Sequence, residues 1–101
     1  MKQIIVYGGP GCPDCTRSKK VLADHDLPFD YRDIKSDPDA YEEFMALVGD
    51  GFQSIPRILF QAGETEVAME TKATLIEPER PELEAALIKH GFIPEQTSTD
   101  I

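Results

Sequence analysis

The chain has 101 residues, of which 41% are hydrophobic and 29% charged, and this balance is typical of one soluble globular domain. Its 19 acidic residues outnumber 10 basic ones, and the net charge of −9 argues against a nucleic-acid partner, which requires clustered Lys and Arg. No apolar run is long enough to cross a membrane, and residues 1–3 lead into a strand-like run rather than a signal peptide. We therefore expect no membrane association and a location in the reducing cytoplasm, where two isolated cysteines indicate a reactive pair.

In chain order, the first predicted element is a strand over residues 3–7, because this run is continuously apolar. A glycine-rich loop over residues 8–11 follows it. Pro13 suits the first position of a helix, and we predict a helix over residues 13–24. Residues 29–34 alternate well enough for a second strand. The side chains that this first helix turns inward are predicted to be Cys15, Ser18, Val21 and Leu22.

A second helix is predicted after Asp37 and Pro38, which have the form of a helix cap and a first-turn proline. Gly49 is a natural end for this helix. Apolar residues at helical spacing predict its core side, which comprises Tyr41, Phe44, Met45 and Val48.

A β-hairpin is predicted next. Residues 57–61 form its first strand, residues 62–64 the turn, and residues around 66–69 a shorter second strand. Residues 70–80 hold few turn signals and are assigned no element. Pro81 is predicted to open a last helix, which ends with Gly91 as its cap.

The predicted order β-α-β-α-β-β-α defines an α/β fold with three layers. The first two strands should be parallel because a helix connects them, and the last two should form an antiparallel hairpin. The result is a four-stranded mixed sheet with helices on both faces. We expect one domain over residues 1–94 and a flexible tail over residues 95–101.

The sequence GCPDC at residues 11–15 holds both cysteines of the chain. The helix N-terminus favours a thiolate at Cys12. The basic cluster of Arg17, Lys19 and Lys20 is either a solvated helix face or a positive field that helps to hold this thiolate or attracts an anionic substrate. Cys12 is therefore the predicted attacking thiol, and the more buried Cys15 the thiol that resolves the mixed disulfide. Asp14 disfavours the thiolate, so we hypothesise that it makes the dithiol a stronger reductant.

A metal-binding alternative uses the same two cysteines. Structural zinc needs four ligands, and His25 and His90 lie far from the pair in sequence, where each is expected at a helix end. A zinc ion or an iron–sulfur cluster would therefore have to be shared across a dimer. We therefore predict no metal site formed by a single chain.

The dipeptide Ile55-Pro56 is the second informative motif. A proline at the start of an edge strand is one reading. The other is a cis bond beside Cys12, with the backbone of Ile55 offered to an extended substrate as in strand addition.

Taken together, the first strand, the Cys-Pro-Asp-Cys motif, residues 54–56 and the closing hairpin and helix resemble a glutaredoxin, the small branch of the thioredoxin fold. The resemblance implies a cytoplasmic, monomeric thiol–disulfide oxidoreductase in cell redox homeostasis and electron transport. It implies that protein disulfides or glutathione mixed disulfides are the substrates. The expected electron donor is glutathione, another thiol or a thioredoxin-reductase-like flavoprotein, with no bound cofactor. The implied site residues are the catalytic Cys12 and Cys15 and the substrate-binding Pro13, Ser54, Ile55, Pro56 and Arg57.

The chain differs from the usual family pattern at three places. Gly9 stands where a basic residue commonly helps to hold the carboxylate of glutathione, and Asp14 replaces an aromatic residue. Residues 69–78 lack the usual Gly-Gly and acidic residue that receive the γ-glutamyl end. These differences predict a divergent glutathione-binding segment, for which Arg57 is a candidate replacement anchor.

Overall fold

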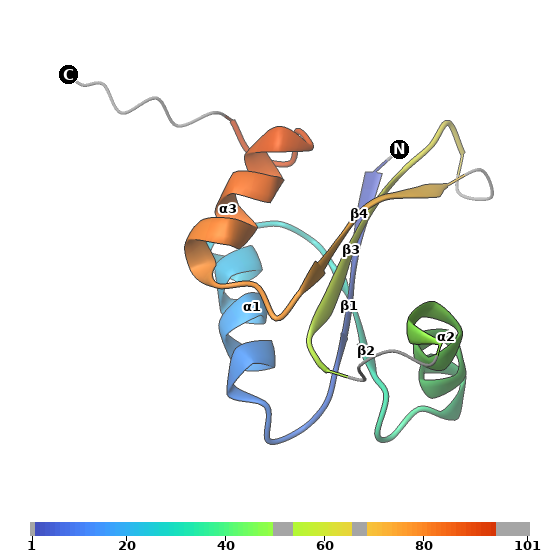
Figure 1. The fold of residues 1–101 in the computed structure, drawn as a ribbon. Coiled ribbons are helices and arrows are strands. Elements are labelled where there is room, and N and C mark those ends of the chain that lie inside the picture. Colours follow the sequence, from blue (N-terminus) through green and yellow to red (C-terminus); the bar gives the residue numbers. More distant parts are fainter. Residues whose placement is uncertain (1, 50–53, 66–68, 95–101) are drawn as a thin grey trace.

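The computed structural model describes residues 2–49, 54–65 and 69–94, and its elements follow the predicted order β-α-β-α-β-β-α (Figure 1). Within these residues no helix has the length and apolar character needed to cross a membrane. The predicted tail lies outside the described residues. The elements are β1 (Lys2–Gly8), α1 (Pro13–Asp24), β2 (Asp30–Asp33), α2 (Pro38–Val48), β3 (Arg57–Ala62), β4 (Glu70–Ile76) and α3 (Arg80–Lys89).

The strands form one mixed sheet in the order β2-β1-β3-β4. Strands β1 and β2 are parallel, whereas β1 and β3, and β3 and β4, are antiparallel. Figure 1 shows α1 and α3 on one face of the sheet and α2 on the other. The predicted four-stranded sheet with helices on both faces is therefore confirmed.

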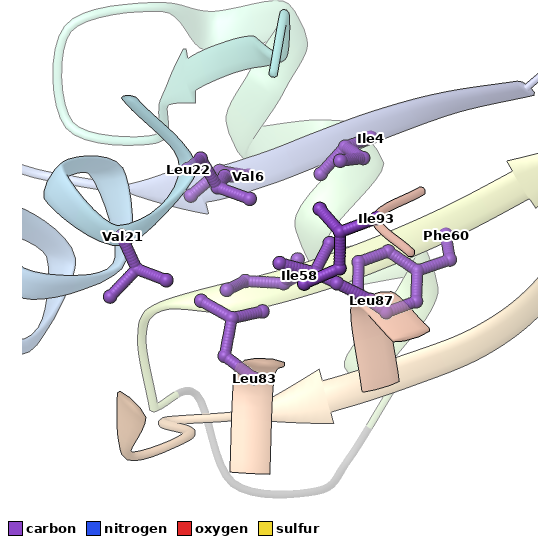
Figure 2. Packing of buried hydrophobic residues seen from close by; sticks show 9 residues of the cluster. All are labelled: Ile4, Val6, Val21, Leu22, Ile58, Phe60, Leu83, Leu87 and Ile93. Atoms are coloured by element: carbon purple, nitrogen blue, oxygen red, sulfur yellow. The ribbon is translucent and has the colours of Figure 1, made fainter. Parts of the chain in front are cut away.

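The face covered by α1 and α3 holds the larger apolar core (Figure 2). Because side chains alternate along a strand, β1 sends Ile4 and Val6 to this face and Ile5 and Tyr7 to the other. The buried residues of the α1/α3 face are Ile4, Val6, Val21, Leu22, Ile58, Phe60, Leu83, Leu87 and Ile93. Those of the α2 face are Ile5, Tyr7, Phe44 and Leu59.

The last strand was misplaced by the sequence prediction. Met69 lies outside any strand, residues 66–68 are outside the described residues, and β4 occupies residues 70–76, to which no element was assigned. The strand pairs antiparallel with β3, from Arg57 opposite Ile76 to Ala62 opposite Glu70. It is an edge strand whose side chains are mostly exposed, so it lacks the apolar run that marked β1 and β3.

The inward face of α1 is as predicted, but Tyr41 of α2 is not in the core. Its side chain is 46% exposed, while Ala40 and Phe44 are buried. Consecutive helical residues point about 100° apart, so packing through Ala40 and Phe44 turns Tyr41 toward the rim. The remaining boundaries agree with prediction within a residue or two, and α3 begins at Arg80 rather than Pro81.

The helix ends follow the local chemistry of the sequence. The Asp37 carboxylate accepts backbone N–H bonds from Asp39 and Ala40 at the start of α2. His25 and His90 are the C-terminal cap residues of α1 and α3, as predicted. Gly91 has a positive φ of 77°, which lets the chain leave α3 and return to the core.

Candidate active site

The start of α1 presents Cys12 as its cap residue. Cys12 has an extended backbone (φ −113°, ψ 102°), and Pro13 is the first helical residue. The backbone N–H of Cys15 donates to Cys12 Sγ at 3.1 Å. This is the position in which a Ser or Asp oxygen usually caps a helix, so the N–H group and the helix dipole would stabilise a negative sulfur.

The two cysteines are joined by a disulfide, with a Cα–Cα distance of 5.2 Å. Their exposures differ: Cys12 is half-buried at the surface, whereas Cys15 is only 1% exposed on the inner side of α1. An incoming disulfide can therefore reach Cys12 but not Cys15. This asymmetry is what the sequence predicted for an attacking and a resolving thiol.

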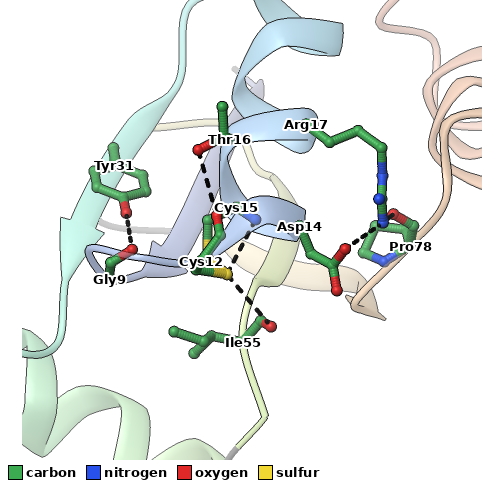
Figure 3. Close-up of a disulfide and its surroundings, with 9 residues drawn as sticks. All are labelled: Gly9, Cys12, Asp14, Cys15, Thr16, Arg17, Tyr31, Ile55 and Pro78. Atoms are coloured by element: carbon green, nitrogen blue, oxygen red, sulfur yellow. Dashed lines mark hydrogen bonds and ion pairs between the residues drawn. A yellow bond between two sulfur atoms is a disulfide. The ribbon is translucent and has the colours of Figure 1, made fainter.

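The segment before β3 lies directly beside the cysteine pair (Figure 3). The Ile55–Pro56 peptide bond is cis, and the carbonyl oxygen of Ile55 is 3.9 Å from Cys12 Sγ. Pro56 is buried, and its carbonyl oxygen accepts the backbone N–H of Glu77 at 2.9 Å. The two motifs that the sequence singled out are thus brought together, about forty residues apart in the chain.

The charged residues that follow Cys12 are engaged with one another. Arg17 Nη2 is 2.9 Å from the Asp14 carboxylate and donates to the Pro78 carbonyl at 3.5 Å. Lys20 pairs with Asp24 at 3.3 Å. Each of the two cations that were expected to favour the thiolate is therefore partly offset by a carboxylate, and Arg17 likewise offsets Asp14. The effect of Asp14 on the redox potential stays a prediction.

The other predicted contact residues differ in how accessible they are. Pro13 is exposed, and Ser54 and Ile55 are half-buried. Arg57 is 7% exposed, and its guanidinium lies 5.8 Å from the ring centroid of Phe44, on the α2 face of the sheet. Its role in binding substrate stays a prediction.

The structure adds a feature that sequence reasoning missed, an open hollow of about 410 Å³ lined by Ile34, Lys35, Tyr41 and Ile55. A Cβ placed on Gly9 would lie 3.1 Å from Lys35 Cγ and 3.5 Å from Ile55 Cδ1, so Gly9 packs closely against two of the residues that line the hollow. The backbone N–H of Lys35 donates to the Asp33 carboxylate at 2.8 Å, which positions the lysine. The absence of a basic side chain at Gly9 was visible in the sequence, but the lysine that packs against this glycine was not.

The metal-binding alternative requires ligands in addition to Cys12 and Cys15. Within the ranges 2–49, 54–65 and 69–94, no three or more His, Cys, Asp or Glu side chains cluster as a metal site. A metal ion or cluster shared across a dimer through Cys12 and Cys15 stays a prediction.

Cys12 caps α1, is bonded to Cys15 and lies beside a cis-proline, and the mixed four-stranded sheet has the thioredoxin-like fold. The chain belongs to the glutaredoxin family, whose model matches residues 4–64, more than half of its length. The family and the fold support a thiol redox function. The match ends before β4 and α3.

Solved structures agree on the fold. A glutaredoxin from Archaeoglobus fulgidus is 17% identical with a TM-score of 0.60, over 84% of this chain and 85% of that one. A mutant of a thioredoxin-like protein is 29% identical (TM-score 0.51) over 64% and 86% of the two chains. A glutaredoxin from Brucella melitensis is 24% identical (TM-score 0.50) over 88% and 90%. No match was found among curated protein sequences.

Proposed function

We propose that the protein is a dithiol thiol–disulfide oxidoreductase that reduces protein disulfides or glutathione mixed disulfides. The observation that supports this most is the unequal exposure of the bonded cysteines, with Cys12 half-buried at the surface and Cys15 buried. The Cys12 thiolate attacks a substrate sulfur, one substrate thiolate leaves, and a mixed disulfide forms. Cys15 then attacks Cys12 Sγ, releases the second substrate thiolate and leaves the internal disulfide.

A trapping experiment tests this proposal. With Cys15→Ser the second step cannot occur, so the substrate should stay bonded to Cys12 after exposure of the reduced variant to cell extract. Mass spectrometry then identifies the adduct, and Cys12→Ser is the matched control that should carry none. A Cys15→Ser protein that remains a free thiol, and a wild type that fails to reduce any disulfide substrate, would contradict the proposal.

The adduct also distinguishes the candidate substrates. Glutathione on Cys12 would support glutathione mixed disulfides, whereas protein adducts would support direct reduction of protein disulfides. The hollow beside Ile55 suits a substrate with a carboxylate, because Lys35 places a positive charge at its wall in a chain of net charge −9. The electron donor is proposed to be glutathione, another thiol or a thioredoxin-reductase-like flavoprotein, for a monomer in the reducing cytoplasm.

A further inference from the structure

The buried Cys15 sulfur shares a small space with the hydroxyl of Tyr31, across Gly8. A Cβ placed on Gly8 would lie 2.8 Å from Tyr31 Oη, 2.9 Å from Cys15 Sγ and 2.9 Å from Tyr31 Cε1, which are the three atoms nearest to that point. Glycine at this position therefore leaves room for both the hydroxyl and the sulfur, which lie within 3 Å of the same point. Any larger residue would come too close to both atoms.

Three contacts of Tyr31 hold its ring in this place. Tyr31 lies on β2 opposite Val6 of β1 and packs against the α1/α3 core. The ammonium group of Lys19 lies 4.0 Å from its ring centroid. Its hydroxyl donates to the Gly9 carbonyl at 3.5 Å. This distance is long for an O–H···O hydrogen bond, so the bond is weak and the hydroxyl can donate to a stronger acceptor instead.

The resolving step places a negative charge on the sulfur that Tyr31 faces. Cys15 must be a thiolate to attack, yet it is 1% exposed, and a buried charge without a hydrogen bond is strongly disfavoured. Burial raises the pKa of Tyr31 above its ordinary value, and the nearby Asp33 carboxylate raises it further. The phenol therefore keeps its proton at neutral pH and is available as a donor.

We propose that the Tyr31 hydroxyl donates a hydrogen bond, directly or through one water, to the Cys15 thiolate during resolution of the mixed disulfide. This rests on the dithiol function proposed above. In that step the bond between Cys12 Sγ and the substrate sulfur breaks and the Cys12–Cys15 bond forms. Cys15 is oxidised, and the substrate sulfur is reduced and leaves as a thiolate. The proton lost by Cys15 goes to solvent, where the departing thiolate is protonated, and Tyr31 neither gains nor loses one.

A single-turnover reaction separates the two steps. Reduced protein mixed with dithiobis(nitrobenzoate) should release one coloured thiolate when Cys12 attacks and a second when Cys15 attacks. For Tyr31→Phe we expect the second phase to be about tenfold slower, as for loss of one hydrogen bond to a charged group, and to require higher pH. The first phase should keep the wild-type rate.

Tyr7→Phe is the matched control. It removes a hydroxyl from the neighbouring strand β1, but on the α2 face, where Tyr7 bonds Glu43 at 3.0 Å. Both phases should keep the wild-type rate in this variant. An unchanged second phase in Tyr31→Phe, or equal slowing of both phases, would overturn the role of Tyr31. A wild type that releases only one thiolate per chain would instead overturn the dithiol function itself, and the role of Tyr31 with it.

A measurement on the wild type covers the case in which Tyr31→Phe does not fold. The nuclear magnetic resonance of Tyr31 Cζ in the reduced protein should shift in step with ionisation of Cys15. The same resonance should not shift over that pH range in the oxidised protein. A Tyr31 signal that ignores Cys15 ionisation would overturn the proposal.

Discussion

The two faces of the sheet differ in their cores, and each lies beside a different cysteine. The α1/α3 face has the large apolar core, the buried Cys15 and the partly buried Tyr31. The α2 face has a smaller core, a polar network of Tyr7, Arg32 and Glu43, and the open hollow lined in part by Ile55, whose carbonyl oxygen lies 3.9 Å from Cys12 Sγ. The larger core therefore lies on the face of the cysteine proposed to resolve the mixed disulfide, and the hollow proposed to receive substrate lies on the other face.

The largest expected effect compares the same substitution on both faces. Leu87 of α3 is fully buried, and Leu59 of β3 is 5% exposed against the smaller α2 cluster. We expect Leu87→Ala to lower the free energy of unfolding by about 4 kcal/mol and Leu59→Ala by about 2 kcal/mol, since the cost rises with the cavity left behind. Urea denaturation at one fixed redox state measures both. An equal or larger loss at Leu59 would break the comparison.

A smaller effect is expected from the polar network of the α2 face. The Tyr7 hydroxyl donates to Glu43 and accepts from Arg32 Nη1 at 3.4 Å. Tyr7→Phe should lower the free energy of unfolding by about 1 kcal/mol, because a partly buried hydrogen bond is lost. Tyr41→Phe, which alters an exposed tyrosine of α2, should change it by less than about 0.5 kcal/mol. Equal losses in the two variants would show that the network contributes nothing.

A charge change at the hollow should have a modest effect on KM that depends on the charge of the substrate. Lys35→Glu should raise the KM for a carboxylate-bearing disulfide such as oxidised glutathione about two- to fivefold, as expected for one exposed ion pair. The KM for the neutral hydroxyethyl disulfide should not change. Lys89→Glu makes the same charge change at the end of α3 and should leave both values as they are. A Lys35→Glu variant that raises the KM of both disulfides equally would contradict the proposal that Lys35 binds the substrate carboxylate.

The sequence was most informative where the chemistry is local. Pro13 after Cys12, and a second cysteine one helical turn on, predict the helix start and the pair without any distant contact. Ile55-Pro56 was singled out, but its distance from Cys12 depends on the pairing of β1 with β3. A cis bond beside Cys12 was one of two interpretations of this dipeptide, and the family resemblance favoured it over an edge-strand proline.

Features set by tertiary contacts were missed. Strand β4 has weak alternation because one edge and most of its side chains face solvent, so only its pairing with β3 reveals it. Periodicity placed Tyr41 in the core, whereas the packing of Phe44 turns it to the rim. Nothing in the sequence singled out Lys35 or Tyr31, because each is placed at the site by packing against a glycine that is distant in the sequence.

The smallest expected effect concerns the rim of the α1/α3 face, where exposed charges join the two helices. Arg80 of α3 bonds Asp24 of α1 at 3.2 Å, and Glu84 is 2.9 Å from His25 Nε2 and 3.1 Å from Arg80. The hydrogen bond from Arg80 lowers the pKa of Asp24 below its usual 3.8, and that from His25 lowers the pKa of Glu84 below 4.5.

A carboxyl group with a lowered pKa in the folded state stabilises the fold above its unfolded pKa, and this contribution is lost as the pH falls through the folded value. The contact between α1 and α3 should therefore keep its full strength down to about pH 4.5 and weaken as the pH falls further, below 3.8. Glu84→Gln should make the fall in the free energy of unfolding with acid shallower than in the wild type, whereas Glu82→Gln, in the exposed first turn of α3, should not. Parallel pH curves for wild type and Glu84→Gln would mean that the larger core alone holds α3 in place.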